Sequence, residues 1–477
     1  MSTLNNQNQK MTNYRWVICA LLFFATTINY LDRQVLSLLA SGIQGEFHWT
    51  DDHYGTITAF FSLFYSVCML FAGRFVDWIG TKKGFLWAIG IWSMGACLHA
   101  FCGIASAGIL EGNWFVGFTE SKEIIKGVSN IALVANTSMG LFIFARAVLA
   151  LGEAGNFPAA IKTIAEYFPK KDRAFSTSVF NSGATIGAML APICIIPLAA
   201  AFSWEWAFFI IGVMGFIWMG FWIFMYKKPE EHPRVNKAEL EYIHSDQDSG
   251  KTNVKEKVSF LKCFKYKQTW SFAFGKFMTD GVWWFLLFWM PKYMGEVYKL
   301  SEGEKILPLT IIYAIVMISL YGGKLPTIII NKTGKDPYAA RMQAMLIFAF
   351  FPLLILLAQP LGSYNYWIAV VIIGIAGAAH QSWSANIFST IGDMFPRKAV
   401  ATITGIGGMA GGIGSFIINK GSGRLFDFAE ATKLPFLGFE GKPAGYFIIF
   451  CICAFAYLIG WVVMKSLVPK YQPITDL

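Results

Sequence analysis

Four ionisable residues interrupt two otherwise apolar stretches of the sequence. Asp32 and Arg33 lie in the first stretch, and Arg146 and Glu153 lie in a later one. A charge at the centre of a membrane-spanning helix costs about 2.5–3.5 kcal/mol on insertion scales, so such residues usually face a partner or a water-filled path. Arg146 and Glu153 are two helical turns apart and therefore share one helix face. We expect a polar site near the middle of a membrane.

These residue types suit the coupling of an anion to a proton. Arginine offers a planar fork of N–H donors that binds a carboxylate through two hydrogen bonds. An organic anion that competes for this arginine would couple its own binding to protonation of a neighbouring acid. The alternative is that Arg33 and Arg146 form permanent structural ion pairs with the two acids.

Membrane-spanning helices must position these residues. The chain has 477 residues, of which 55% are hydrophobic and only 14% are charged, whereas soluble domains carry about 25% charged residues. Its apolar runs are continuous and near 20 residues long, which favours helices over a β-barrel. The first run is too long for a signal peptide and contains two charges, so it is interpreted as the first span.

We predict an all-α polytopic membrane protein with about twelve transmembrane helices in two six-helix halves, a pattern typical of duplicated transporters. The expected domains are a first half, a charged cytoplasmic linker and a second half, with an outer insertion near 106–136 in the first half: 1–226, 227–268 and 269–477. The predicted spans are 15–40, 54–73, 84–105, 137–160, 174–201, 206–226, 269–291, 306–330, 339–358, 364–392, 400–419 and 444–465.

The distribution of basic residues predicts the orientation in the membrane. Lysine and arginine gather in the even-numbered loops and in the linker, whereas residues 41–55 contain neither. Cytoplasmic loops carry this basic excess, so both termini should be cytoplasmic. Lys420 and Arg424, after the predicted eleventh span, weaken the pattern without reversing it. The net charge of +10 is interpreted as this topology signal and not as a nucleic-acid footprint.

The loop between the second and third spans reads GRFVDWIGTKKG, residues 73–84. It resembles the signature loop of the major facilitator superfamily, with Phe75 in place of the usual leucine. The matching residues would form a gating element: Gly73, Asp77, Gly80, Lys82 and Lys83. Gly73 would permit close helix approach, and Asp77 would cap a helix end or pair with a base in one conformation.

A finer resemblance covers nearly the whole chain. The segments NYLDRQ (29–34) and RAVLALGEAGNFPA (146–159), with two stretches of the second half, resemble the anion:cation symporter family and its bacterial hexuronate transporters. The resemblance implies proton-driven uptake of a carboxylated sugar. It also implies acids that carry protons, bases that bind the carboxylate and a nearby tyrosine: Asp32, Glu153, Arg33, Arg146 and Tyr65. Among them we favour Arg33 for the carboxylate, and Glu153, followed closely by Asp32, as the proton carrier. The insertion at 106–136 departs from the short loop expected there.

Polar residues of the second half are further candidates for substrate binding. His380, Trp383 and Ser384 could share one helix face and line a cavity, with Asn386 further round. Lys276 could bind substrate, pair with Asp280 four residues on, or extend to the membrane interface. Asn181 in the fifth span is a similar candidate. The alternative for the polar group is ordinary packing and interhelical hydrogen bonding.

Cofactor chemistry is not indicated. The glycine run in residues 405–415 lacks a preceding strand and a P-loop lysine, and Gly407, Gly408, Gly411 and Gly412 instead match small-xxx-small helix packing. The eight cysteines show no metal or disulfide spacing. We expect no cofactor and no metal.

The sequence therefore predicts a monomeric proton symporter for a hexuronate-like sugar acid in the bacterial inner membrane. Its partners would be the sugar-acid anion, the proton and the lipid bilayer, with no nucleic acid. The first alternative is a symporter for another organic anion, such as an aldonate, an aldarate or another monocarboxylate. The others are an intramembrane enzyme that uses Asp32, Glu153 and His380, and a sugar-acid sensor that does not transport.

Overall fold

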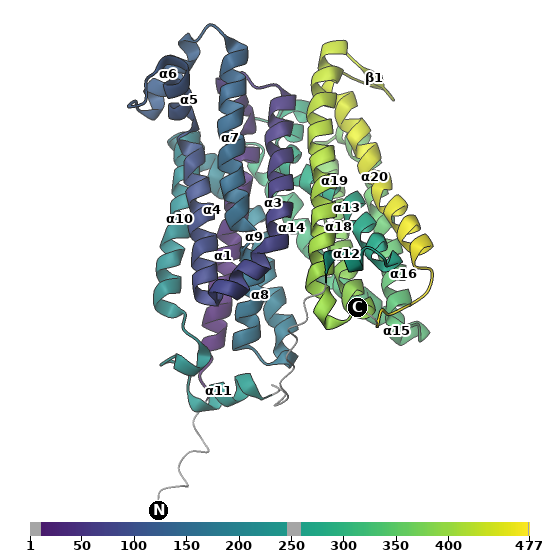
Figure 1. Cartoon of the computed structure of the whole chain (residues 1–477). Coiled ribbons are helices and arrows are strands. Elements are labelled where there is room, and N and C mark those ends of the chain that lie inside the picture. Colours follow the sequence, from purple (N-terminus) through teal and green to yellow (C-terminus); the bar gives the residue numbers. More distant parts are fainter. Residues whose placement is uncertain (1–10, 246–258, 476) are drawn as a thin grey trace, which may run out of the picture.

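Long helices that run side by side make up most of the protein (Figure 1). The computed structural model describes residues 11–245, 259–475 and 477. An apolar chain in lipid must satisfy its backbone N–H and C=O groups internally, which continuous helices achieve. The all-α class is thus confirmed, apart from a two-stranded antiparallel hairpin of β1 (Pro435–Phe436) and β2 (Phe439–Glu440).

The helices form two groups, which Figure 1 shows beside one another. We call α1–α10 the first half: α1 Tyr14–Leu38, α2 Ala40–Phe47, α3 Asp51–Ile79, α4 Thr81–Ala100, α5 Cys102–Glu111, α6 Phe118–Gly127, α7 Ile131–Glu153, α8 Asn156–Tyr167, α9 Lys170–Ala201 and α10 Trp204–Met225. The second half comprises α13 Lys267–Tyr298, α14 Ile306–Val316, α15 Leu325–Thr333, α16 Pro337–Phe350, α17 Ile355–Gly362, α18 Tyr366–Met394, α19 Arg397–Thr432 and α20 Lys442–Leu467. Single 3₁₀ segments join α14 to α15 (Met317–Lys324) and α16 to α17 (Phe351–Leu354).

The apolar spans agree with the predicted architecture. Among the described residues, ten helices are long and apolar enough to cross a membrane, and the pair α4–α5, bent by 55°, brings the number to eleven. The 32-residue α13, which contains Lys276 and Asp280, is the remaining long helix. Several boundaries differ from the predicted ones, and the largest difference is at α19, which runs to Thr432 and not to residue 419. Lys420 lies inside this helix and pairs with Asp52, so the polar end of α19 is stabilised by contact with α3.

The two ends of the helix bundle differ in what they carry. The linker end carries η1 (Pro229–Glu231), α11 (Lys237–His244) and α12 (Phe260–Cys263), and the insertion end carries α5, α6 and the β hairpin (Figure 1). At the linker end, Glu239 of α11 accepts hydrogen bonds from the backbone N–H groups of Tyr14 and Arg15, both at 3.1 Å, at the start of α1. Its carboxylate also pairs with the Arg15 guanidinium at 3.0 Å. The linker helix is therefore attached to the first half.

Small residues bring α19 close to both halves. A Cβ added to Gly407, Gly411 or Gly412 would lie within 2.1 Å of a side-chain atom on α13 or α3. The predicted small-residue packing is confirmed at these three positions. It was wrong at Gly408, where a Cβ would meet open space. Helix α19 therefore joins the second half to α3 of the first half along a tight interface.

Candidate functional site

Arg33 and Glu153 form a buried ion pair between α1 and α7. The Nε and Nη2 atoms of Arg33 donate to Oε2 of Glu153 at 3.0 and 2.6 Å. The two side chains are 4% and 0% exposed. The charges of two distant sequence segments thus meet, because the long side chains of Arg33 on α1 and Glu153 on α7 reach each other inside the first half. Only one oxygen of Glu153 is used in this pair. An incoming anion could therefore compete with Glu153 for the Arg33 guanidinium.

Aromatic rings surround the Arg33 guanidinium. Its Cζ atom lies 4.8 Å from the ring centres of Tyr30 and Tyr65 and 4.9 Å from the ring of Trp284. Phe61 is slightly further, at 5.6 Å. Rings at this distance favour a cation through their negative faces. Trp284 belongs to α13, so Arg33 lies at the boundary between the two halves.

Arg146 lies deeper in the first half and has looser contacts. Two of its nitrogens reach the Arg33 carbonyl oxygen at 3.5 Å, and its Cζ atom lies 5.1 Å from the ring of Phe61. Its Nε atom has no hydrogen-bond partner among the described residues. The permanent pairing of each arginine with an acid, the structural alternative, is therefore found for Arg33 and Glu153 in this conformation but not for Arg146.

Two carboxyl groups in this cluster have oxygens without hydrogen-bond partners. Within the described part of the chain, both oxygens of Asp32 and Oε1 of Glu153 lack a partner. Asp32 and Glu153 are each only 1% exposed. A buried polar group without a hydrogen bond is costly, and a buried charge without a partner costs more. These acids are therefore placed where a proton or a donor group on a ligand would be strongly bound.

Lys276 and Asp280 form the predicted i,i+4 ion pair on α13. The Lys276 Nζ atom lies 2.8 Å from Oδ1 of Asp280 and 4.3 Å from the ring centre of Phe388. Residues four apart occupy neighbouring positions on one helix face, so Lys276, Asp280 and Trp284 form a stripe along α13. Because Trp284 contacts Arg33, this stripe leads from the central cluster toward the linker end.

The polar group of α18 contacts neighbouring helices of the second half. His380 Nδ1 lies 2.8 Å from the Tyr457 hydroxyl, and its ring stacks on Trp283 at 5.2 Å. Trp383 also packs on Tyr457, which belongs to α20, so both side chains face the interior of the second half. The Asn386 amide donates to the Ser382 carbonyl of its own helix at 2.8 Å. In this conformation these side chains contact α13, α18 and α20, and their expected role in lining a substrate cavity stays a prediction.

Two other candidates lie apart from the buried cluster. Ser384 is half-buried on α18, and Asn181 is exposed on α9. Their helical spacing had placed them correctly in spans but could not tell which neighbouring helix each would face. Among the described residues, no group of three or more His, Cys, Asp or Glu side chains could hold a metal ion.

The signature loop between α3 and α4 pairs with α8. Asp77 lies 2.9 Å from the Lys162 Nζ atom, which also donates to the Val76 carbonyl at 3.2 Å. Gly80 has a φ of 85°, which favours glycine at the turn into α4. Gly73 does not mark a close approach here, because an added Cβ would only reach the Pro158 side chain at 3.9 Å.

A second charged cluster lies at the insertion end and was missed from the sequence. Asp51, 3% exposed at the start of α3, pairs with Lys292 of α13, and its other oxygen lies 2.9 Å from the Lys442 Nζ atom. Lys442 also pairs with Glu296 at 3.0 Å. Lys292 ends a long apolar run, and this was the one sequence signal that could have indicated it.

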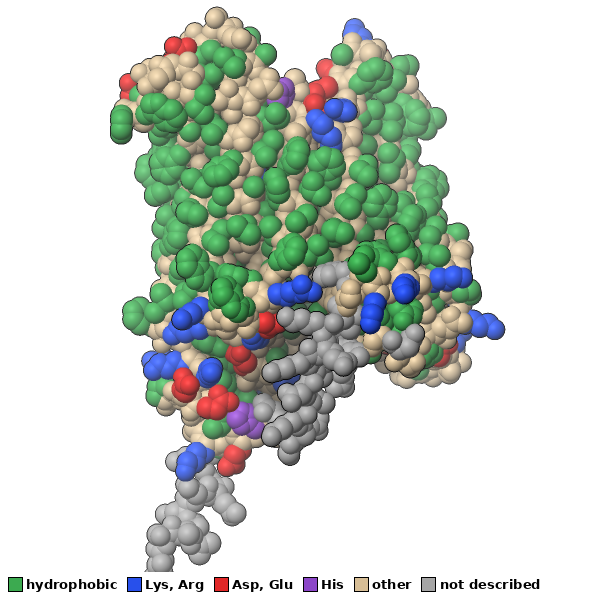
Figure 2. All heavy atoms as spheres, in the orientation of Figure 1, with side chains coloured by type: hydrophobic (Ala, Val, Ile, Leu, Met, Phe, Trp, Pro, Cys, Tyr) green, Lys and Arg blue, Asp and Glu red, His purple; other side chains and the backbone are tan. Residues whose placement is uncertain are grey.

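The same end carries an unusual helix cap. The Asp427 carboxylate of α19 accepts hydrogen bonds from the backbone N–H groups of Asp51 and Asp52 at 2.9 and 2.8 Å. Asp52 in turn pairs with Lys420 at 2.6 Å. Figure 2 shows acidic and basic side chains together at this end, between the two halves. We call these residues the insertion-end cluster: Asp51, Asp52, Lys292, Glu296, Lys420, Asp427 and Lys442.

Long apolar helices in two halves, with a buried charged cluster at their boundary, define an integral membrane protein of the transporter class. The sequence model of the Major Facilitator Superfamily matches residues 22–418. The chain belongs to the Major Facilitator Superfamily, and it is a membrane transporter and not an enzyme.

Named relatives agree with this assignment. The chain is 28% identical over 456 residues to a hexuronate transporter of Escherichia coli, an alignment that covers 91% of this chain and 96% of the relative. It is 23% identical to a probable galactarate/D-glucarate transporter of the same species, over 86% of this chain and 88% of the relative. A bacterial homologue of the lysosomal transporter Spinster has the same fold, with a TM-score of 0.70, 18% identity, and coverage of 98% and 100%.

Proposed function

We propose that the protein imports a hexuronate-like sugar acid together with a proton by alternating access. The similarity to a hexuronate transporter supports the substrate class. The buried Arg33–Glu153 pair at the boundary of the halves supports both anion binding and proton coupling. The linker end would face the cytoplasm of an inner-membrane protein, in agreement with the basic even-numbered loops. The transporting unit would be a monomer.

Arg33 is the proposed binding group for the substrate carboxylate. It lies between the halves, where Tyr65 and Trp284 from opposite halves flank its guanidinium. A substrate bound there would contact both halves and could therefore affect the conformation of each. Arg146, which is held inside the first half under Phe61, would add positive potential without direct contact. The aromatic rings would pack against the apolar face of the sugar ring.

Glu153 is the proposed coupling acid. A substrate carboxylate that binds Arg33 takes the partner that Glu153 now uses through Oε2. Glu153 would then be a buried carboxylate without a partner, which proton binding neutralises. Substrate and proton therefore favour each other's binding, as linkage requires. Asp32, whose oxygens already lack partners among the described residues, is the proposed second proton site.

A dicarboxylate substrate is the second candidate. The similarity to a probable galactarate/D-glucarate transporter favours it, and so does the additional base Lys276 on the stripe that starts at Trp284. A sugar diacid could place one carboxylate on Arg33 and the other near Lys276, where it would compete with Asp280. A monoacid would use Arg33 alone and leave the Lys276–Asp280 pair intact.

Alternating access would move the two proposed units, 1–226 and 269–477, against each other through the linker 227–268. The insertion-end cluster holds the halves together in this conformation. It would have to separate when the central site opens to the outside. The residues of the signature loop, Gly73, Asp77, Gly80 and Lys82, would act at the linker end, where Asp77 pairs with Lys162.

Purified protein in proteoliposomes tests this function. An inwardly directed proton gradient should drive accumulation of radiolabelled glucuronate above its external concentration, without chemical change of the solute. Competition by galacturonate, an aldonate, glucarate and galactarate would rank the substrates. Accumulation that is independent of the gradient would contradict proton coupling, product formation would indicate an enzyme, and binding without accumulation would indicate a sensor.

A further inference from the structure

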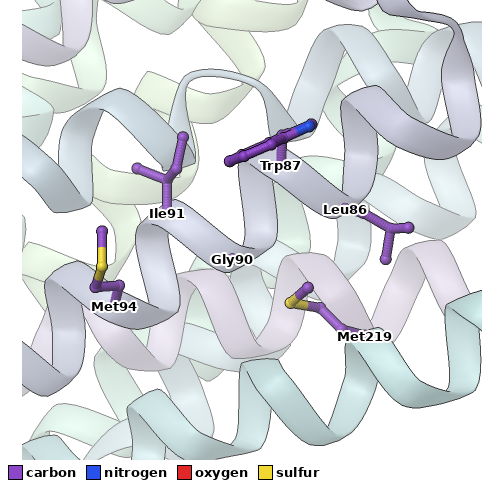
Figure 3. Close-up of a pocket in the computed structure, with 6 residues that line it drawn as sticks. All are labelled: Leu86, Trp87, Gly90, Ile91, Met94 and Met219. Atoms are coloured by element: carbon purple, nitrogen blue, oxygen red, sulfur yellow. The ribbon is translucent and has the colours of Figure 1, made fainter.

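A groove on the outer surface of the first half is apolar and contains no residue of the central cluster or the insertion-end cluster. It has a volume of about 330 Å³ between α4 and α10, and its lining is apolar: Leu86, Trp87, Gly90, Ile91, Met94 and Met219 (Figure 3). Trp87 and Met94 are 60% and 48% exposed, so the groove opens to the surroundings of the bundle. The groove is open at Gly90 because this residue has no side chain. A Cβ there would touch the Met219 side chain at 3.5 Å.

One end of this groove is basic. Residues four apart on a helix share a face, so Lys83 precedes Trp87 by one turn, and Lys82 precedes Leu86 in the same way. The Lys82 Nζ atom donates to the carbonyl of Ile223 on α10 at 2.9 Å, so its ammonium bridges the two helices that form the groove. Ile223 follows Met219 by one turn.

The basic end also has a third cation. Lys227 follows Ile223 by four residues, just after α10 ends at Met225, and it is exposed. Lys83 is exposed as well, and Lys82 is half-buried. The groove thus passes from an apolar notch at Gly90 to a rim of three lysines at the linker end. The apolar notch would suit the acyl chain of an anionic lipid, and the lysines at the rim would suit its headgroup.

We propose that this groove is a binding site for one phospholipid with an anionic headgroup. One acyl chain lies in the notch over Gly90, between Trp87 and Met94, and the phosphate lies at Lys82, Lys83 and Lys227. Charge complementarity selects the anionic phospholipid, because basic pockets between membrane helices on the cytoplasmic side bind anionic headgroups. Each lysine near the surface contributes to this attraction, and the buried chain adds the apolar contact.

Native mass spectrometry of the full-length protein in detergent tests the headgroup contact. The protein is titrated with phosphatidylglycerol and, separately, with phosphatidylcholine of the same chains. The wild type should bind its first phosphatidylglycerol more tightly than phosphatidylcholine, and the double variant K82Q/K83Q should bind phosphatidylglycerol about tenfold more weakly. The matched control K332Q/K335Q, which removes two lysines from the linker end of the second half, should bind as the wild type does.

A second variant tests the groove itself. Gly90→Leu fills the notch and should weaken the first phosphatidylglycerol several-fold. Gly140→Leu is its control, because Gly140 is exposed on α7 with nothing within 4 Å of an added Cβ. Wild-type affinity in both K82Q/K83Q and G90L would overturn the proposal. Equal binding of the two lipids to the wild type, or a dimer that either variant dissociates, would overturn it as well.

A measurement on the wild type avoids any folding defect of the variants. In vesicles that contain a small fraction of bromine-labelled lipid, Trp87 should be quenched more by labelled phosphatidylglycerol than by labelled phosphatidylcholine. The Trp87 contribution is the difference between the wild type and Trp87→Phe, which retains an aromatic ring in the groove. Equal quenching by the two labelled lipids would overturn the assignment of an anionic phospholipid.

Discussion

The central cluster and the insertion-end cluster are both buried networks of acids and bases, but they join different parts of the molecule. In the central cluster, Arg33 and Glu153 both belong to the first half. In the insertion-end cluster, Asp51 of the first half pairs with Lys292 and Lys442 of the second half. The Asp51–Lys292 pair is as shielded as the central pair, since Asp51 is 3% and Lys292 2% exposed, whereas outer members of the cluster such as Lys442 are partly exposed.

This difference separates two tasks. Two partners within one half keep their distance when the halves move, so the Arg33–Glu153 pair changes only when a ligand or a proton competes for it. Partners on opposite halves must separate when the insertion end opens, so Asp51–Lys292 contributes to the balance between conformations. We therefore propose that the central cluster binds the substrate and couples it to the proton, and that the insertion-end cluster stabilises the closed state of the insertion end. Variants in the two clusters should fail in different assays.

Removal of the Arg33 side chain should have the largest effect. Arg33→Ala deletes the carboxylate partner and leaves Glu153 buried without its base, and breaking a buried pair in this way costs about 3–5 kcal/mol. Apparent affinity for the sugar acid should fall more than about a hundredfold. The control is Arg341→Ala, which breaks an ion pair with Asp393 within the second half. Wild-type affinity in R33A would transfer the carboxylate role to Arg146 or Lys276.

Loss of Lys292 should open the insertion end without a comparable loss of the binding groups. Lys292→Ala leaves Asp51 with Lys442 as its remaining base. We expect labelling of a Ser62→Cys reporter by a membrane-impermeant thiol reagent to accelerate about tenfold or more. Ser62 is fully buried on α3, and the background carries Cys194→Ser to remove the exposed native thiol.

Lys122→Ala is the matched control for this experiment. Lys122 pairs with Glu205 at 3.0 Å and Glu46 at 3.4 Å, so it forms partly buried ion pairs at the same end but within one half. In the K122A variant, the rate at which Ser62→Cys is labelled should equal the rate in the parent protein without that substitution. Equal acceleration in K122A and K292A would mean that ion pairs at this end stabilise the fold in general, and the distinction between the clusters would fail.

The helix cap across the halves should have a smaller effect. Asp427→Ala removes the acceptor for the backbone N–H groups of Asp51 and Asp52, and loss of a helix cap costs about 1 kcal/mol. The same labelling rate should rise about fivefold. Thr50 also caps this helix through its hydroxyl, so part of the capping remains. An effect as large as that of K292A would show that the cap, and not the ion pair, holds this end closed.

Substitution of Lys276 should give the smallest and most selective effect. If a second carboxylate binds near this base, Lys276→Gln should weaken glucarate uptake about threefold more than glucuronate uptake. The Lys276–Asp280 pair is on the proposed path but not at the Arg33 site, so monoacid affinity should change little. Equal loss for both solutes would remove the argument for a dicarboxylate substrate.

The sequence predicted the fold and half of the central site, for physical reasons. Charges inside apolar runs are costly, so Arg33 and Glu153 could be identified as functional candidates before their contact was known. Of the aromatic surround only Tyr65 was predicted, through the family resemblance, because nothing distinguishes Phe61 or Trp284 among the 44 phenylalanines and 17 tryptophans of the chain. Their role depends on which helices cross near α1, and helical periodicity does not contain that information.

Helical periodicity also leaves open which neighbouring helix a given face will contact. Spacing correctly placed His380 and Trp383 on related faces of α18, but that face meets Tyr457 of α20 inside the second half. The apolar run predicts that the seventh span ends at residue 291, whereas α13 continues to Tyr298 and so includes Lys292. In both cases the missing information was the neighbouring helix and not the local structure.

The most direct test of the account compares two assays of Glu153→Gln in proteoliposomes. Glutamine keeps the shape of the side chain but cannot carry the proton. Gradient-driven accumulation of the sugar acid should be abolished, while exchange of labelled for unlabelled solute across the membrane should continue at a rate near that of the wild type. Full gradient-driven accumulation in E153Q would contradict the assignment of Glu153 as the coupling acid.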